Sequence, residues 1–436
     1  MRQLFTCCLF VVALVAELHE SHAASPAGVA ASDPVQIGPT DWPWWRGPKF
    51  DGIALGNQNP PLTWSDASSE PGGKTENVVW RTPIIGRGHG SPTIVGDRIY
   101  LATADVEAQV QSVLALDRAS GKLLWQTPVH QGNFDPKGNL KSSHASSTVA
   151  CDGRRLFINF LNAGAIHTSA LDLDGKIIWQ AKVCDFVNHQ GFGSSPAVYK
   201  QTVIVSADNK GGGAIVALER ATGKVVWRVE RPSLPNYTSP ILFTIAGREQ
   251  LLLTGCDLVT SLDPATGAKL WEVAGATTEC VTSTVTDGSR IFTSGGYPKN
   301  HLSAVEADGS GKLAWESATR VYVPSMLVQE GYLYAVLDAG VATCWNSATG
   351  EELWKQRVGG TFSASPVLVG DKIFAIDEKG RTVIFRASSK EFEQLGENQL
   401  GDEAFATPTF VDNRIYFRVA KTTDGKRQEY VYCIGK

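Results

Sequence analysis

A set of imidazole and aromatic side chains recurs at one position of a repeated pattern in this 436-residue chain. Each unit opens with a pair of Ser, Thr or Pro residues, and an alternating strand follows the pair. The residues two positions before the eight openings are His89, His144, Gly193, Tyr237, Val281, Tyr322, Ser363 and Phe405. Close by are Arg87, His189, Phe192, Glu279 and Phe362. If the openings meet at one mouth, these side chains could bind a flat or sugar-like ligand, or grip a peptide loop.

Three interpretations of this set stay open: its members pack the mouth, bind a ligand or peptide, or take part in catalysis. Histidine could also ligate a metal, but no carboxylate spacing supports a metal site. Ser143-His144 suggests a hydrolase, yet no G-x-S-x-G motif is present. The glycine-rich turn at 210–213 does not open a helix, which argues against a phosphate site. We therefore assign no catalytic residue and no metal ligand.

The elements that would position these residues are copies of an internal repeat. In one copy, ALERATGKVVW, the acidic Glu219 is followed by Gly223 and closed by Trp227. Acidic or amide residues and glycine favour a tight turn, so each copy predicts two antiparallel strands joined by a hairpin. A recurrent indole suggests packing between neighbouring repeats. The closing residues are Trp80, Trp125, Trp179, Trp227, Trp271, Trp315 and Trp354.

The spacing of these tryptophans predicts the fold. Successive closing tryptophans are 39 to 54 residues apart, and a four-stranded propeller blade needs about 40–50 residues. We predict an all-β, eight-bladed β-propeller of four-stranded antiparallel blades. Blades 1 to 7 are expected at 89–129, 144–183, 191–230, 237–275, 280–319, 322–360 and 361–400. Blade 7 departs from the pattern, with Phe392 and Leu395 where its tryptophan should be.

The last blade is expected to use both ends of the chain. Three strands are predicted at 406–411, 414–420 and 429–434, which leaves the blade one strand short. The strand at 77–82, which carries Trp80, can supply the fourth. Pairing it with the last strand would close the ring and remove the free edges.

The remaining segments predict an exported protein. Residues 1–23 have the charge and apolar run of a signal peptide without a clear lipobox, too short to span a membrane. Residues 24–60 comprise a linker, to about residue 40, and a Trp-rich arm; residues 61–436 are the propeller. In the arm, Arg46 is expected to stack on an indole or pair with Asp51. The arm either caps the channel and helps bind a ligand, or only plugs one end. The polar insertion at 132–141 should project from a rim.

Charge and cysteine content exclude some classes of function. The net charge is −4 with both signs mixed, and no basic stripe indicates nucleic-acid binding. The six cysteines of the mature chain lack C-x-x-C spacing, so zinc is not supported, while free thiols and disulfides both stay open. They are Cys151, Cys184, Cys256, Cys280, Cys344 and Cys433.

The phrase A-x-D-x-x-T-G-x-x-x-W resembles the tryptophan-docking motif of pyrroloquinoline quinone (PQQ)-like repeat propellers. That family contains quinoprotein dehydrogenases and non-catalytic propellers similar to the scaffold protein BamB. The arm WPWWRGPKFDG resembles the opening of quinone-repeat proteins common in Planctomycetes. The resemblance covers nearly the whole mature chain and implies the fold, but fold alone does not decide function.

Among the functions that the resemblance implies, we expect a periplasmic or secreted, monomeric scaffold that binds a protein, a peptide or a small carbohydrate-like ligand without a cofactor. One alternative is a PQQ-dependent oxidoreductase that acts on an alcohol or sugar with calcium. Such enzymes hold the quinone against a vicinal disulfide and near a calcium site and a catalytic Asp. The mature chain has no adjacent cysteines and no recognisable calcium cluster. A carbohydrate-associated accessory protein is a further alternative.

Overall fold

The computed structural model describes residues 33–66, 74–136 and 138–436. Residues Pro34–Lys436 form one compact unit, which is described below. The predicted signal peptide at 1–23 lies outside the described residues. In the part of the chain that the structure describes, no helix is long and apolar enough to cross a lipid bilayer.

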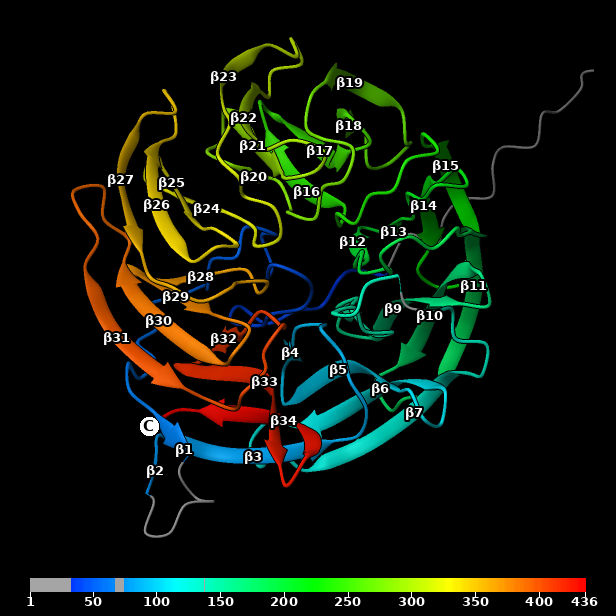
Figure 1. Cartoon of the computed structure of the whole chain (residues 1–436). Coiled ribbons are helices and arrows are strands. Elements are labelled where there is room, and N and C mark those ends of the chain that lie inside the picture. The colour runs from blue at the N-terminus through cyan, green and yellow to red at the C-terminus, as the bar shows by residue number, and fades with distance from the viewer. Residues whose placement is uncertain (1–32, 67–73, 137) are drawn as a thin grey trace, which may run out of the picture. The chain divides into compact units, whose positions relative to one another are not determined.

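Eight four-stranded antiparallel sheets surround a common axis as the blades of a propeller (Figure 1). In seven blades, four strands that are consecutive in the chain are also neighbours in the sheet, so each of these blades is a meander. Inner strands of neighbouring blades contact one another at several places around the axis, for example β4 with β8 and β32 with β4. The prediction of an all-β, eight-bladed propeller is therefore confirmed.

The inner strands are β4 (Thr93–Val95), β8 (Ala150–Cys151), β12 (Ala197–Tyr199), β16 (Ile241–Ile245), β20 (Val285–Thr286), β24 (Leu327–Gln329), β28 (Val367–Val369) and β32 (Thr409–Val411). The second strands are β5 (Arg98–Asp105), β9 (Arg155–Asn162), β13 (Thr202–Ser206), β17 (Arg248–Gly255), β21 (Arg290–Gly295), β25 (Tyr332–Val336), β29 (Lys372–Ile376) and β33 (Arg414–Thr423). These second strands are largely buried, because neighbouring blades cover both of their faces.

The third strands are β6 (Val110–Asp117), β10 (Ala165–Asp172), β14 (Ala214–Glu219), β18 (Leu258–Leu262), β22 (His301–Glu306), β26 (Val341–Asn346), β30 (Arg381–Arg386) and β34 (Lys426–Ile434). The outer strands are β7 (Leu123–Gln131), β11 (Ile177–Asp185), β15 (Val225–Glu230), β19 (Lys269–Ala274), β23 (Leu313–Ser317), β27 (Glu352–Arg357), β31 (Gln394–Gln399) and β3 (Val78–Ile84). A separate two-stranded sheet consists of β1 (Ser65–Asp66) and β2 (Thr75–Glu76).

Blade 8 joins the two ends of the propeller. Its strand order is β3-β34-β33-β32, and β3 pairs antiparallel with β34 from Val78 opposite Ile434 to Ile84 opposite Glu429. Figure 1 shows the blue β3 beside the red β34. This pairing confirms the predicted closure and satisfies the edge of β34 that would otherwise be free.

The closing tryptophans lie between neighbouring blades. At six junctions the indole N–H donates to a backbone carbonyl in the turn between the third and outer strands of the next blade. The bonds are Trp80 to Arg118 (3.2 Å), Trp125 to Leu173 (3.0 Å), Trp179 to Arg220 (3.0 Å), Trp227 to Pro264 (3.2 Å), Trp315 to Ser347 (2.8 Å) and Trp354 to Ser388 (2.7 Å). Each of these indoles is thus buried or half-buried and satisfies its one donor.

The junction between blades 4 and 5 uses a side chain as an extension. Trp271 donates to the side-chain oxygen of Gln250 (2.9 Å), and the Gln250 amide donates to the Ala307 carbonyl (3.0 Å). The turn of blade 5 is one residue longer than the common form. The buried glutamine therefore makes the connection that the indole makes directly elsewhere.

Blade 7 replaces its own tryptophan with one from the N-terminal segment. In the sheet register, Trp227 of blade 3 lies opposite Ala217, whereas the equivalent pair in blade 7 is Gly396 opposite Ile384. The prediction that Phe392 and Leu395 occupy the tryptophan position was therefore wrong. Trp64, 3% exposed, packs in this region, with its ring centroid 5.4 Å from that of Phe417 in blade 8.

The Trp-rich arm crosses the channel along the inner strands. The backbone N–H of Trp42 donates to the Ile94 carbonyl of β4 (2.8 Å), and the backbone N–H of Ala54 donates to the Leu368 carbonyl of β28 (2.8 Å). The guanidinium of Arg46 donates to the carbonyls of Met326, Pro366 and Asp51. The predicted Arg46–Asp51 contact is therefore to the Asp51 backbone.

The segment just before the arm also packs on the propeller. Gln36 N–H donates to the Asp152 carbonyl of blade 2 (2.8 Å), and Val35 and Ile37 pack against the core of blades 2 and 3. The predicted linker therefore ends before these residues.

Candidate functional site

A chain of hydroxyl groups lines the channel where the inner strands begin. At six junctions the backbone N–H of a Ser or Thr donates to the side-chain oxygen of the equivalent residue in the next blade. The pairs are Ser91 to Thr148 (3.0 Å) and, each at 2.9 Å, Thr148 to Ser195, Ser195 to Ser239, Ser283 to Ser325, Ser325 to Ser365, and Ser365 to Thr407. These bonds explain why a hydroxyl residue opens each repeat.

A cavity of about 500 Å³ lies at this mouth. All eight residues that stand two positions before the hydroxyl chain line it: His89, Ser146, Gly193, Tyr237, Val281, Val323, Ser363 and Phe405. Phe192 and Tyr322 line it as well. Trp45 of the arm is also in the lining, and its indole N–H donates to Ser283 Oγ (2.8 Å). The arm therefore closes one end of the channel, and Trp45 lies where it meets the cavity.

Half-buried rings dominate the walls of the cavity. His89 and Phe405 stack with ring centroids 4.5 Å apart. Burial, and then the nearby Glu279 carboxylate, raise the pKa of Tyr322 to about 12 and also raise that of Tyr237. Both phenols stay protonated at neutral pH, so they can donate and accept hydrogen bonds.

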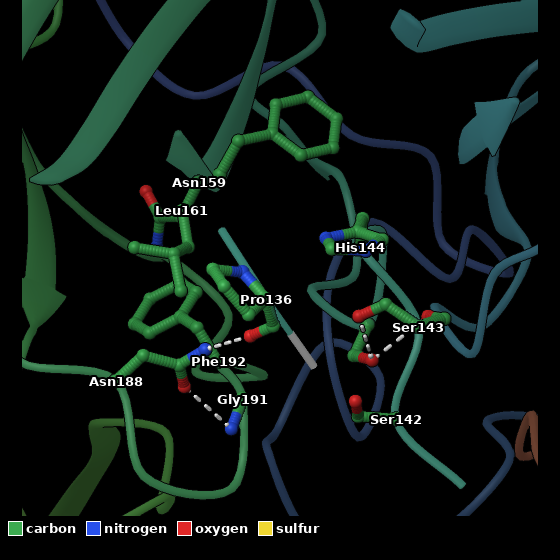
Figure 2. A pocket seen from close by; sticks show the side chains of 11 residues that line it. Pro136, Ser142, Ser143, His144, Asn159, Leu161, Asn188, Gly191 and Phe192 are labelled. Carbon is green, nitrogen blue, oxygen red and sulfur yellow. Dashed lines mark hydrogen bonds between the residues drawn. The ribbon is translucent and has the colours of Figure 1, made fainter. Parts of the chain in front are cut away.

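His144 does not belong to this set, although the sequence pattern placed it there. The hydroxyl chain uses Thr148 in blade 2, so the residue equivalent to His89 is Ser146. His144 lies two residues earlier and lines a small neighbouring hollow of about 20 Å³. Its ring is 4.5 Å from that of Phe134. Asn188 braces this hollow by donating to the Pro136 carbonyl (2.7 Å) and accepting the Gly191 N–H (2.9 Å) (Figure 2).

Two other predicted site residues lie outside the mouth. Phe362 is 1% exposed and packs in the core of blades 6 and 7. Arg46 is buried in the arm, and burial lowers its pKa to about 10. The sequence pattern could not separate these residues from the mouth, because it does not reveal the path of the arm or which face of a loop is buried.

Arg87 and His189 lie near the mouth without lining the cavity. The Arg87 guanidinium lies 5.7 Å from the ring centroid of Phe405 and 3.6 Å from Glu403. His189 Nε2 is 3.2 Å from Glu279 Oε1. Both residues tie mouth loops of different blades together.

The insertion between blades 1 and 2 turns inward, contrary to the prediction that it projects from a rim. Asn139 and Lys141 line the cavity. The Lys141 ammonium pairs with Glu378 of blade 7 (2.7 Å), which also accepts the Ser363 hydroxyl (2.6 Å). The insertion thereby links distant blades across the mouth.

The lining of the cavity does not match the donor set of a PQQ–calcium site. PQQ is a tricarboxylate, and calcium requires several oxygen ligands that include carboxylates. None of the described lining residues is Asp, Glu or Cys, and their one ammonium group, Lys141, is paired with Glu378. Among the described residues, no group of three or more His, Cys, Asp and Glu side chains could hold a metal ion.

The six cysteines of the propeller are free thiols, and five of them are buried. Cys344 lies opposite Trp354, and Cys433 lies opposite Trp80, where other blades have a small residue such as Ala217. Burial raises the pKa of Cys344 to about 12 and that of Cys433 to about 11. These thiols act as small apolar side chains that make room for an indole.

Comparison with known proteins finds relatives with different activities. A family model described as outer membrane protein assembly factor BamB matches residues 72–126, 109–356 and 298–395. Tetrathionate hydrolase of Acidithiobacillus ferrooxidans is 24% identical over 363 residues, which cover 69% of this chain and 65% of that protein. Outer membrane protein assembly factor BamB of Burkholderia pseudomallei is 27% identical over 326 residues, covering 69% and 75%.

A solved structure agrees at the level of the fold. Quinohemoprotein alcohol dehydrogenase from Comamonas testosteroni superimposes with a TM-score of 0.66 at 15% identity, covering 91% of this chain and 81% of that one. Such a likeness establishes the architecture and leaves the activity open. Because the matching family model spans most of the propeller, the chain belongs to the outer membrane protein assembly factor BamB family of PQQ-like repeat propellers.

Proposed function

We propose that this protein is an exported, non-catalytic propeller that holds a segment of a partner protein in its mouth. The observation that carries the proposal is the composition of the cavity: rings and hydroxyls from seven blades and Val281 from blade 5, with no carboxylate among the described lining residues. A mostly apolar, partly enclosed surface with a few hydrogen-bonding groups is typical of a binding site.

The mouth offers two kinds of contact to a peptide. The stacked pair His89–Phe405 and the phenols of Tyr237 and Tyr322 present faces and edges to an aromatic or aliphatic side chain. Hydroxyl groups such as that of Ser363 can bond the amides of its backbone. The protein from Burkholderia pseudomallei is named as an outer membrane protein assembly factor. By that likeness we propose a periplasmic location and a strand of an outer-membrane protein, with alternating aromatic residues, as the partner segment.

Calorimetric titration with a model strand tests the proposal. The probe is acetyl-Ser-Tyr-Thr-Phe-Ser-amide, and its control has Ser in place of Tyr and Phe. We expect saturable binding of the aromatic peptide that falls by about ten-fold or more in Tyr237→Ala and Phe405→Ala, because each removes a buried ring contact. Val225→Ala, an exposed change on the outer strand of blade 3, should bind as the parent does.

The same titration with PQQ, with and without calcium, tests the oxidoreductase alternative. Tight one-to-one binding of PQQ that is lost in His89→Ala would overturn the scaffold proposal. Binding of a disaccharide but not of the aromatic peptide would instead support a carbohydrate-associated role. Equal heats for the aromatic and serine peptides would also count against the proposed mode of binding.

A further inference from the structure

We propose that the junction between blades 5 and 6 is a receptor for one arginine side chain of a partner protein. The site is separate from the mouth, since mouth residues precede each inner strand whereas this site is built on the turns that follow β20 and β24. Its test is therefore independent of the proposed function.

The junctions between blades 2 and 3 and between blades 8 and 1 each contain an arginine–aspartate pair. In each, an arginine directly after the third strand of one blade reaches the aspartate that follows the inner strand of the preceding blade. Arg220 of blade 3 pairs with Asp152 of blade 2, and Arg118 of blade 1 pairs with Asp412 of blade 8. Arg220 is 1% exposed, so its guanidinium is an integral part of that junction.

Blade 5 keeps the aspartate with the same local bonding. Asp287 Oδ1 accepts the N–H of Arg290 (2.7 Å), as Asp152 Oδ1 accepts that of Arg155 (2.6 Å). Asp287 Oδ2 accepts the Arg290 guanidinium (2.8 Å), and Asp152 Oδ2 accepts that of Arg155 (3.3 Å). The two carboxylates therefore face the next blade in the same way.

Blade 6 lacks the arginine that would complete the junction. Ser347 stands at the position of Arg220, since the indole of the preceding blade bonds the carbonyl of each. The short Ser347 hydroxyl donates to Asp287 Oδ2 (3.1 Å), where Arg220 donates to Asp152. A serine leaves empty the space that an arginine side chain fills at the other junction.

A surface hollow of about 410 Å³ marks that space. Asp287 and Glu330 bring two carboxylates to its lining, and Tyr332 brings an aromatic ring. Arg290, the only arginine among the described lining residues, already contacts Asp287 and Glu306. A guanidinium suits the combination of carboxylate and aromatic ring better than an ammonium does, because it is planar, donates in a fork and stacks on rings.

The direct test uses N-acetyl-arginine methylamide as the probe and the amide NMR signals of Ser347 and Ala348 as the readout. We expect saturable shifts in the parent protein and weaker shifts with N-acetyl-lysine methylamide. Ser347→Arg should weaken binding of the arginine probe by about ten-fold or more, because the chain then fills its own hollow. Asp287→Asn should weaken it to a similar degree, since the carboxylate loses its charge.

Ser310→Arg is the matched control, because it adds the same side chain to an exposed turn of blade 5. It should leave probe binding unchanged. The Ser347→Arg protein should also melt at a higher temperature than the parent, and Asp287→Asn should cancel that gain. Shifts that are absent, equally strong with lysine, or unchanged in Asp287→Asn would overturn the proposal; the last comparison decides even if Ser347→Arg does not fold.

Discussion

At the scale of single residues, a turn glycine and the indole of the preceding blade require each other. Gly223 has φ +74°, and a Cβ there would lie 2.6 Å from Cε3 of Trp179. Gly425 also has φ +74°, but a Cβ there would meet nothing within 4 Å. Substituting alanine at each of these two glycines therefore separates the energetic cost of the backbone conformation from that of the clash with the indole.

We therefore expect Gly425→Ala to lower the free energy of unfolding by about 1 kcal/mol, the usual cost of a left-handed residue with a side chain. Gly223→Ala should cost about 1–3 kcal/mol more, because the Trp179 ring must move. Urea denaturation of both variants measures the difference. Equal losses would show that the indole contact is not tight.

A pair of histidines between blades 1 and 2 makes stability depend on pH. Their ring centroids are 5.2 Å apart; burial, and then the charge of His167, lower the pKa of His130 to about 4. Burial, and then Lys182, lower the pKa of His167 as well. The unfolded chain, with histidine pKa near 6.5, binds more protons than the folded chain in this range.

The contribution of these two histidines to the free energy of unfolding should consequently be fully present above about pH 6.5. It should be lost progressively as the pH drops from there toward 4. Urea denaturation at pH 7 and pH 5 measures this loss, and His130→Gln should reduce it. If the variant kept the full pH dependence of the parent, other groups would be responsible.

The mouth residues of seven blades could be located from the sequence within one position, but that of blade 2 could not. The residues of the mouth could be recognised because each precedes a hydroxyl that serves the inter-blade chain. Blade 2 offers Ser146, Ser147 and Thr148 in succession. Only the hydrogen bonds reveal that Thr148 is the equivalent residue, so the pattern placed His144 two residues out of register.

At the scale of elements, the N-terminal segment completes blade 7 from outside. Gly396 stands where a closing tryptophan is expected, and the Leu62 carbonyl lies 2.8 Å from the position of a Cβ on it. The side chain of Asn398, on the same strand, accepts the backbone N–H of Trp64 (2.9 Å) and donates to the Leu62 carbonyl (2.9 Å). The segment and β31 therefore form one packing unit.

Trp64→Ala should lower the free energy of unfolding by about 3–5 kcal/mol, because it empties a large space between blades 7 and 8. Leu140→Ala, at a side chain that is 93% exposed, is the control and should change stability little. Thermal or urea unfolding tests both. A small loss at Trp64 would mean that blade 7 does not depend on this segment.

Elements were predictable wherever the chain repeats itself. Hairpin chemistry and tryptophan spacing predicted the blades and the mixed composition of blade 8. The arm and the insertion at 132–141 occur once each, so no second copy indicates which surface they cover. Their courses depend on tertiary contacts such as the pair between Lys141 and Glu378.

At the scale of the whole molecule, the ring is held shut by β3. Deleting Val78–Ile84 would expose the edge of β34 and remove the Trp80 contact with blade 1. An unpaired edge favours pairing with another chain. We expect this deletion to convert the protein to dimers or aggregates, measured by light scattering after size exclusion. A stable, cooperative monomer would show that the closure is dispensable.

The closure also determines when, during synthesis of the chain, the mouth can be completed. His89 comes from the start of blade 1 and Phe405 from the start of blade 8, yet their rings stack. During synthesis, more than 300 residues must follow His89 before its neighbour exists, and β3 has no partner until β34 emerges. A chain that stops before β34 thus lacks a closed ring, and one that stops before Phe405 also lacks part of the cavity wall. Binding at the mouth therefore requires that synthesis has reached blade 8, because the last residues of the lining are Phe405 and Thr407.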